Sequence, residues 1–443
     1  MAKMQGYCWP LSVAPGEDIE FRIATGSPRY GLTFVKFQNR DPAEVTPEVI
    51  RNSQELQEYP VSATLELPGQ LQPAPDPDDL GCGTWDFSFR LEIPGDWDSN
   101  IYAAKCTEVD DPATQSLGET FYIVFVVNPV PERRNRLLVL ANVTAWNAYN
   151  TYGGRSRYTT SGGVWKLSYL RPNPHTINLT IPDTADSPLV QLRYKVAETT
   201  RHLARGEMWV LSWLQQNNYA CDVFTDLDWH DGIIDAQEYA GVILSTHPEY
   251  WSVQMMTNLK SYLAQGGNLV YLGADAIFDA VDLNEDLTVI TVYGPVAPRT
   301  HLFRQPVIGM PESEVLGIGY KKQTAQRRGY TVKDASHRFM RGLANGQVIG
   351  TEGWCTPVGG VSLSEGAASG WEVDRQDDNS PTVTLLAEGN NADDGEDAAQ
   401  MIYYDHPGGG FVFSTGSLTF GGSLVVDAQL QQIVRNALDE ILS

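Results

Sequence analysis

The first third of the chain alternates hydrophobic and polar residues in short runs. The clearest alternation covers residues 85–93, where every second residue is hydrophobic, and a shorter one covers residues 19–23. A period of two is typical of half-buried antiparallel strands. Further strands are expected at residues 31–37, 62–67, 100–106 and 120–127. Because proline- and glycine-containing turns separate these runs, the pattern predicts an all-β sandwich domain over residues 1–131.

The pattern changes after a polar, proline-bearing segment at residues 128–135, which is typical of a linker. Continuous hydrophobic runs, as in strands covered on both faces, then alternate with segments of helical period. The strands are expected at residues 137–140, 222–225, 242–244 and 269–272, and the helices at 198–217 and 253–264. This alternation predicts a doubly wound α/β domain over residues 132–443, of the flavodoxin-like or glutamine-amidotransferase-like kind.

The last part of the chain first departs from this alternation of strands and helices and then returns to it. Residues 315–404 are irregular and rich in Gly and Asp, and they predict a β-rich insertion. A strand at residues 411–413 and an amphipathic helix over residues 427–442 follow.

Composition narrows the possible functions. The chain has 31 Lys and Arg against 55 Asp and Glu, a formal charge of −24, which argues against nucleic acid as a partner. A hydrophobic content of 42% excludes a disordered chain. No apolar run reaches the roughly 20 residues that cross a bilayer, and residues 1–7 lack a signal-peptide core, so a cytoplasmic protein is expected.

Chemistry is expected beyond the carboxyl ends of the parallel strands, where sites form in doubly wound sheets. Residues 142–158, rich in Tyr and Asn, follow the first of these strands. Residues 245–251 follow the strand at 242–244, and residues 273–275 follow the strand at 269–272. Meeting at one edge, these loops would combine tyrosines, a histidine, a glutamate and an aspartate. Such a set predicts an oxygen-rich metal pocket.

The segment His247-Pro248-Glu249 is the most suggestive part of these loops. Its proline stiffens the backbone, and residues two apart in an extended chain face the same way. Two plainer interpretations remain open at this point. Glu249 would begin the next helix, where a carboxylate suits the positive end of the dipole, and the tyrosine-rich loop would be an ordinary surface loop. No nucleophile elbow or phosphate-binding loop competes with the metal pocket.

Four segments together resemble the large (beta) subunit family of N,N-dimethylformamidase. They are residues 144–158, 219–230, 245–252 and 266–278. The opening residues 9–17 and the strand pair at 95–129 resemble the β-sandwich module of that family. The resemblance implies a mononuclear iron, Fe(III), held by two tyrosinates and one glutamate.

Carried over to this sequence, the resemblance gives Tyr149, Tyr158 and Glu249 as the metal ligands, with His247 beside them as a catalytic or orienting residue. The family's loop between the two tyrosines is longer, so Tyr152 and Tyr169 compete with Tyr158 for the second position.

Two further acids are implied by the resemblance as catalytic. Glu372 lies in a segment similar to one that carries an acid–base carboxylate, and Asp275 stands where the family usually has Asn. An ionised Asp accepts hydrogen bonds and would oppose a developing oxyanion. Either the substrate offers a donor or a positive charge, or Asp275 is protonated, or the amidase activity is lost. The plainer interpretation makes Asp275 a helix N-cap.

The sequence therefore predicts a hydrolase that cleaves the C–N bond of a small linear amide with iron-activated water. The small amide is the expected partner, together with further copies of the chain and a small subunit such as the family's enzymes have. A non-catalytic protein that retains the scaffold, with the sandwich binding glycans or proteins, is the alternative.

Overall fold

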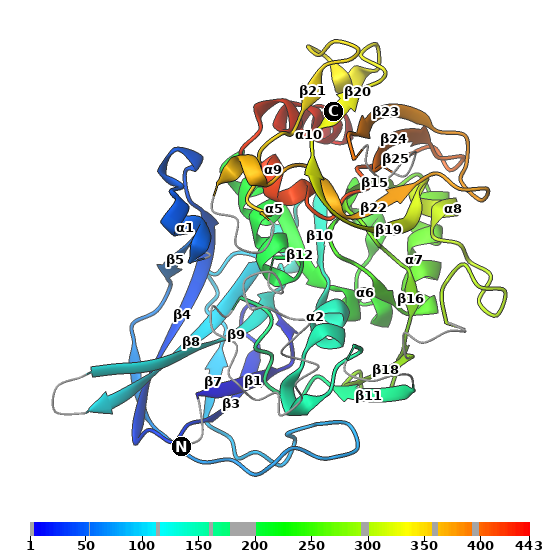
Figure 1. Cartoon of the computed structure of the whole chain (residues 1–443). Coiled ribbons are helices and arrows are strands. Elements are labelled where there is room, and N and C mark those ends of the chain that lie inside the picture. Colours follow the sequence, from blue (N-terminus) through cyan, green and yellow to red (C-terminus); the bar gives the residue numbers. More distant parts are fainter. Residues whose placement is uncertain are drawn as a thin grey trace.

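The computed structural model of this chain describes residues 4–52, 54–111, 116–158, 163–177, 201–293, 301–356, 362–391 and 398–443. Within them the chain is mixed α/β and contains several sheets, which confirms this part of the prediction. Figure 1 shows the N-terminal strands gathered on one side and a larger, helix-covered sheet on the other. None of the helices in this part of the chain has the length and apolar character needed to cross a bilayer.

Two sheets of N-terminal strands share one hydrophobic core. The smaller has the order β1 (Gln5–Trp9), β3 (Asp18–Ala24), β7 (Phe89–Glu92). The larger has the order β2 (Ser12–Val13), β9 (Ser116–Val127), β8 (Asn100–Asp111), β4 (Arg29–Asn39), β5 (Leu56–Pro60), and β6 (Leu65–Pro68) also pairs with β4. Aromatic rings from both sheets meet in this core, where the ring centroid of Phe21 lies 5.5 Å from Phe34 and 5.8 Å from Phe125. The alternation therefore turns one face of each strand into the core.

The strand predicted at residues 85–93 is shorter than its alternation suggests, because β7 begins at Phe89. The backbone N–H of Trp85 donates to Cys82 O at 2.9 Å, which places Trp85 in a turn. Phe87 is 51% exposed. Packing of the Trp85 ring into a separate small cluster thus overrides the local pattern.

A nine-stranded sheet carries the second half of the chain. Its order is β12 (Cys221–Thr225), β10 (Leu137–Ala141), β13 (Gly241–Thr246), β15 (Asn268–Gly273), β25 (Phe411–Ser414), β24 (Gln400–Asp405), β23 (Thr384–Gly389), β20 (Tyr330–Val332), β21 (Val348–Ile349). The first five strands pair in parallel and the others antiparallel. Every residue of β10, β12 and β13 is buried, as the hydrophobic runs at residues 137–140 and 242–244 predict for β10 and β13.

Helices cover this sheet (Figure 1). They are α5 (Ala204–Gln216), α6 (Asp226–Asp231), α7 (Val253–Ala264), α9 (Phe420–Leu424) and α10 (Ala428–Leu442), with the short α8 (Ser313–Leu316) beside β25. Helix α2 (Val143–Tyr149) follows the end of β10, and the short α1 (Pro47–Arg51) belongs to the N-terminal part. The bounds of α7 are those predicted: the Ser252 side chain accepts from Met255 N–H at its start, and Gly266, with φ +95°, follows its end. Helix α5 begins at Ala204, later than predicted, and residues 198–200 lie outside the described residues.

The β-rich segment predicted as an insertion is in part an extension of the main sheet. Strands β20, β21, β23 and β24 all belong to the nine-stranded sheet. Strands β19 (Gly319–Arg328) and β22 (Ser369–Arg375) form a separate antiparallel pair. Two small sheets complete the fold near the site: β14 (Tyr250–Trp251) pairs with β16 (Asp279–Ala280), and β11 (Val164–Ser168), β18 (Val289–Tyr293) and β17 (Asp282–Leu283) form the second.

Candidate metal centre

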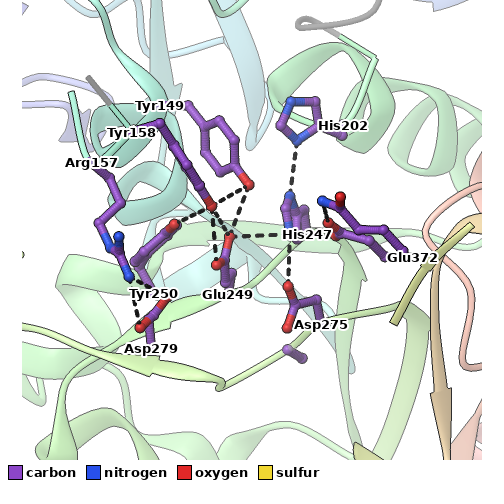
Figure 2. A network of polar contacts seen from close by, with 12 residues as sticks. Tyr149, Arg157, Tyr158, His202, His247, Glu249, Tyr250, Asp275, Asp279 and Glu372 are labelled. Carbon is purple, nitrogen blue, oxygen red and sulfur yellow. Dashed lines mark hydrogen bonds and ion pairs between the residues drawn. The ribbon is translucent and has the colours of Figure 1, made fainter. Parts of the chain in front are cut away.

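The loops that follow β10, β13 and β15 meet at one edge of the nine-stranded sheet. The first loop contains α2 and carries Tyr149 and Tyr158, and the second carries His247 and Glu249. Asp275 follows β15. Because these strands are parallel and adjacent, their carboxyl ends lie side by side. Figure 2 shows that the side chains converge.

The two predicted phenols and the predicted carboxyl ligand are in direct contact. The hydroxyl oxygens of Tyr149 and Tyr158 lie 2.8 Å apart. The Tyr149 hydroxyl donates to Glu249 Oε2 at 3.0 Å, and the Tyr158 hydroxyl lies 3.3 Å from both oxygens of Glu249 (Figure 2). Tyr149 and Glu249 are buried. The three residues therefore form one cluster of oxygen atoms.

The two competing tyrosines point elsewhere. The Tyr152 hydroxyl contacts Cys82 Sγ at 3.8 Å in the small cluster around Trp85. The Tyr169 ring packs against Trp9, at 6.2 Å between centroids, and lines a cavity of about 40 Å³. Of the three candidates for the second phenol, Tyr158 is therefore the one that the structure places against Glu249.

Buried Arg171 organises the loop between the two phenols. Its guanidinium donates to the backbone carbonyls of Asn147, Asn150, Tyr152 and Arg155 at 3.1–3.2 Å, and also to the Asn147 side-chain oxygen. Burial lowers the pKa of Arg171 to about 9. Sequence reasoning missed this residue, because nothing in its local pattern shows which carbonyls it meets.

Glu249 does not begin a helix. Helix α7 begins at Val253 with Ser252 as its N-cap. The carbonyl of Glu249 instead accepts from the backbone N–H groups of Phe278 and Asp279, at 3.0 and 3.1 Å. The interpretation of Glu249 as a helix-start residue is therefore wrong, since the β14–β16 pairing holds its backbone in an extended form.

His247 lies among three buried carboxyl groups. Its Nε2 is 3.0 Å from Glu372 Oε2, 3.3 Å from Glu249 Oε2 and 3.8 Å from Asp275 Oδ2. Burial lowers the pKa of His247, but the carboxylates of Glu372 and Glu249 more than offset this, so the pKa lies above its ordinary value. The structure thus brings together four of the predicted site residues, which are His247, Glu249, Asp275 and Glu372.

Asp275 is not a helix N-cap either, because residues 274–278 form no helix. Its backbone is left-handed, with φ +55°, and its N–H donates to Asp374 Oδ1 at 2.9 Å. Thr246 and Trp371, which directly precede His247 and Glu372, also have positive φ. Such conformations cost energy in residues other than glycine and concentrate at functional sites.

Several contacts of the site were not predicted. His202 Nδ1 lies 2.9 Å from His247 Nδ1, and the Tyr250 hydroxyl lies 2.6 Å from that of Tyr158. Arg157 forms a buried ion pair with Asp279, at 3.1 Å. For Tyr250 and Arg157 a signal existed, since each directly adjoins a predicted ligand in the sequence.

The oxygen cluster fits a small hard cation. Oxygens in neighbouring positions of an octahedral ion, at about 2.0–2.1 Å from it, lie about 2.9 Å apart. The separations among the Tyr149, Tyr158 and Glu249 oxygens are 2.8, 3.0 and 3.3 Å. Burial first, and then Asp275, raises the pKa of Glu249, while burial and Glu249 raise that of Tyr149. A cation among these oxygens would favour their ionised forms.

Sequence comparisons match this chain to one family of proteins. A sequence model of the family described as "N,N-dimethylformamidase beta subunit-like, C-terminal" matches residues 51–433. The N,N-dimethylformamidase beta subunit of Paracoccus aminophilus is 23% identical over 436 residues, covering 81% of this chain and 54% of that protein. That of an Alcaligenes species is 22% identical with the same coverage. The chain thus spans about half the length of these curated relatives.

A solved structure of a cytoplasmic protein from Salmonella typhimurium is similar over 69% of this chain and 98% of that one. Its sequence identity is 10% and its TM-score 0.35, and this slight likeness carries no argument about the site.

Proposed function

The chain belongs to the N,N-dimethylformamidase beta subunit-like family, and we propose that it is an iron-dependent hydrolase of small linear amides. The proposal is supported above all by the contact of the Tyr149, Tyr158 and Glu249 oxygens at the edge of the sheet. Hard oxygen donors suit Fe(III), and the three groups, when ionised, match its charge. Tyr149, Tyr158 and Glu249 would hold the iron.

Bound there, iron would polarise the carbonyl oxygen of the amide and make a water molecule more acidic. Glu372 is the group best suited to take the proton. Burial raises its pKa, but His247 outweighs this, so the pKa of Glu372 lies below its ordinary value, which favours the ionised form. The side chain is held by Gln323, whose Nε2 donates to Glu372 Oε1 at 2.7 Å.

The proposed reaction then balances in two steps. Water adds to the amide carbon while Glu372 accepts its proton. The C–N bond breaks as Glu372 returns this proton to the leaving nitrogen, which gives a carboxylic acid and an amine. His247 lies beside both acids, with its Nε2 3.0 Å from Glu372 Oε2 and 3.3 Å from Glu249 Oε2.

Asp275 does not suit oxyanion stabilisation. An ionised carboxylate accepts hydrogen bonds and repels a developing negative charge. Burial and the neighbouring Glu372 raise the pKa of Asp275, which favours its protonated form unless a cation compensates the charge. A role in which the charge of Asp275 is compensated agrees better with these surroundings.

Two architectural points belong to the same proposal. We interpret the paired N-terminal sheets as a sandwich domain, ending near residue 131, and the parallel part of the nine-stranded sheet as doubly wound. The relatives are named as beta subunits, so we propose that a second kind of subunit joins this chain. Self-association and a cytoplasmic location stay predictions.

The proposal is tested with metal analysis, visible absorption and amine release from a panel of amides. We expect one iron per chain and a tyrosinate-to-Fe(III) absorption band. Tyr149→Phe should lose both, whereas Tyr152→Phe, the matched control, should keep them, because the Tyr152 hydroxyl faces Cys82. A colourless protein that takes up no iron would favour the non-catalytic binding protein instead.

A further inference from the structure

Buried carboxyl groups that the proposed iron ligands leave unused surround His247. The side chains of Asp275 and Glu372 are 6% and 4% exposed, and both face His247 Nε2. Buried charges require a compensating partner. Yet Asp275 Oδ1 and His247 Nε2 make no hydrogen bond with any residue that the structure describes. This part of the site therefore offers donor atoms that are oriented but unsatisfied.

His202 orients the imidazole of His247. The two Nδ1 atoms lie 2.9 Å apart, so they share one hydrogen when both rings are neutral. His202 is in turn held edge-on against the ring of Tyr149, at 4.5 Å between centroids. A metal-ligating histidine commonly donates its other ring N–H to such a partner, which fixes the tautomer and leaves the second nitrogen free to bind. Here that second nitrogen is Nε2, which faces the acids.

The backbone holds the Asp275 carboxyl close to this nitrogen. The left-handed conformation of Asp275 is maintained by its N–H bond to Asp374, and the next N–H, of Ala276, donates to the Tyr271 hydroxyl at 3.1 Å. For a residue other than glycine this conformation is sterically disfavoured. Glu249 approaches from the neighbouring loop, and Figure 2 shows Glu249 and Glu372 on either side of His247.

We propose that His247 Nε2, Glu249 and Asp275 form a second cation site, next to the proposed iron site and sharing Glu249 with it. Their ligand atoms all lie within 4.8 Å of one another. Nε2 is 3.3 Å from Glu249 Oε2 and 3.8 Å from Asp275 Oδ2. Around a tetrahedral ion with ligands at about 2.0–2.2 Å, donors lie roughly 3.3–3.6 Å apart, so small movements admit the ion.

The donor set selects the class of ion. One imidazole nitrogen and two carboxylates suit a divalent first-row ion such as Zn²⁺ or Mn²⁺. Such an ion balances the two formal charges of Asp275 and Glu372 that the iron does not use. It also accounts for a carboxylate at position 275. This second cation site is an addition to the proposed hydrolase activity, and its divalent ion can bind whether or not iron is bound.

The test uses the full chain, stripped of metal by a chelator, loaded with Fe(III) and titrated with Zn²⁺ alone. Elemental analysis should find one iron and one zinc per chain. Asp275→Asn should weaken zinc binding at least about 100-fold in calorimetry, since it removes a direct ligand, while the iron absorption band remains. Asp222→Asn is the matched control, because Asp222 is equally buried but lies near the start of β12.

Other variants separate this site from the iron centre. Tyr149→Phe should lose iron and keep zinc. If the wild-type protein binds zinc but takes up no iron, only the proposed hydrolase activity is refuted. If zinc and iron compete so that each chain binds only one metal ion, the second site is overturned. It is also overturned if Asp275→Asn folds and its zinc affinity stays within threefold of that of the wild type. In wild-type protein holding Fe(III) and Mn²⁺, a manganese magnetic-resonance signal unperturbed by iron also overturns it.

Discussion

Replacing Arg171 should unfold the loop that carries the two phenols. In Arg171→Met, five acceptors lose a donor: four backbone carbonyls and the Asn147 side-chain oxygen. The Asn147 carbonyl still accepts from Asn150 N–H at 3.1 Å, so four acceptors lose the donor that the structure gives them. Methionine fills much of the same volume but has no N–H group. The loop residues Asn147–Arg155 would then have to find other partners or move.

The size of the effect follows from these contacts. Each buried acceptor left unsatisfied costs about 1–3 kcal/mol, so four would cost roughly 4–12 kcal/mol if none relaxed. Two effects reduce this sum. The guanidinium is itself buried without an ion pair among the described residues, as its lowered pKa reflects, and a cavity of about 40 Å³ beside it can admit water. We therefore expect Arg171→Met to lower the free energy of unfolding by about 3–5 kcal/mol.

Urea unfolding measures this loss, and iron content measures its consequence at the site. Arg171→Lys is the matched comparison: its three N–H donors reach at most three of the five acceptors, so its stability should fall between the other two proteins. Iron retention should decline in the same order. If Arg171→Met stays within about 1 kcal/mol of wild type and retains iron, the reasoning that this side chain organises the loop is refuted.

Three further changes test other contacts. Tyr250→Phe removes the hydroxyl 2.6 Å from that of Tyr158, so the iron absorption band should move to longer wavelength and iron affinity should fall about 10–100-fold, whereas Tyr239→Phe should change neither. Burial raises the pKa of Glu207 from 4.5 to about 7, so the folded protein holds a proton that the unfolded chain releases. The contribution of Glu207 to the free energy of unfolding should therefore fall by roughly 3 kcal/mol as pH rises from 4.5 to 7. Urea unfolding of Glu207→Gln should lack this part of the pH dependence, and an identical pH dependence in both proteins would contradict the prediction. Asp279→Asn leaves Arg157 buried without its ion-pair partner and should cost about 3–5 kcal/mol in urea unfolding, and a loss below 1 kcal/mol would show the pair to be dispensable.

The sequence alone was enough wherever the determining interactions are local. Helix α7 has its predicted bounds because Ser252 caps its first turn and Gly266 ends it, all within a few residues. The buried strands of the nine-stranded sheet were predicted because each reads as a continuous hydrophobic run. Since the carboxyl ends of adjacent parallel strands meet, these strands were also enough to predict which loops carry the candidate site.

Only the tertiary structure decided between residues that look alike locally. Tyr158 was the predicted second phenol, but Tyr152 and Tyr169 competed with it until contacts from Arg171 determined the path of the loop. The alternation at residues 85–93 continued past the real strand, because Trp85 packs in a distant cluster. Which side chains face His247 was likewise undetermined, since His202 and Glu372 are 45 and 125 positions away in the chain. Contacts between segments so far apart leave no periodic or local signal in the sequence.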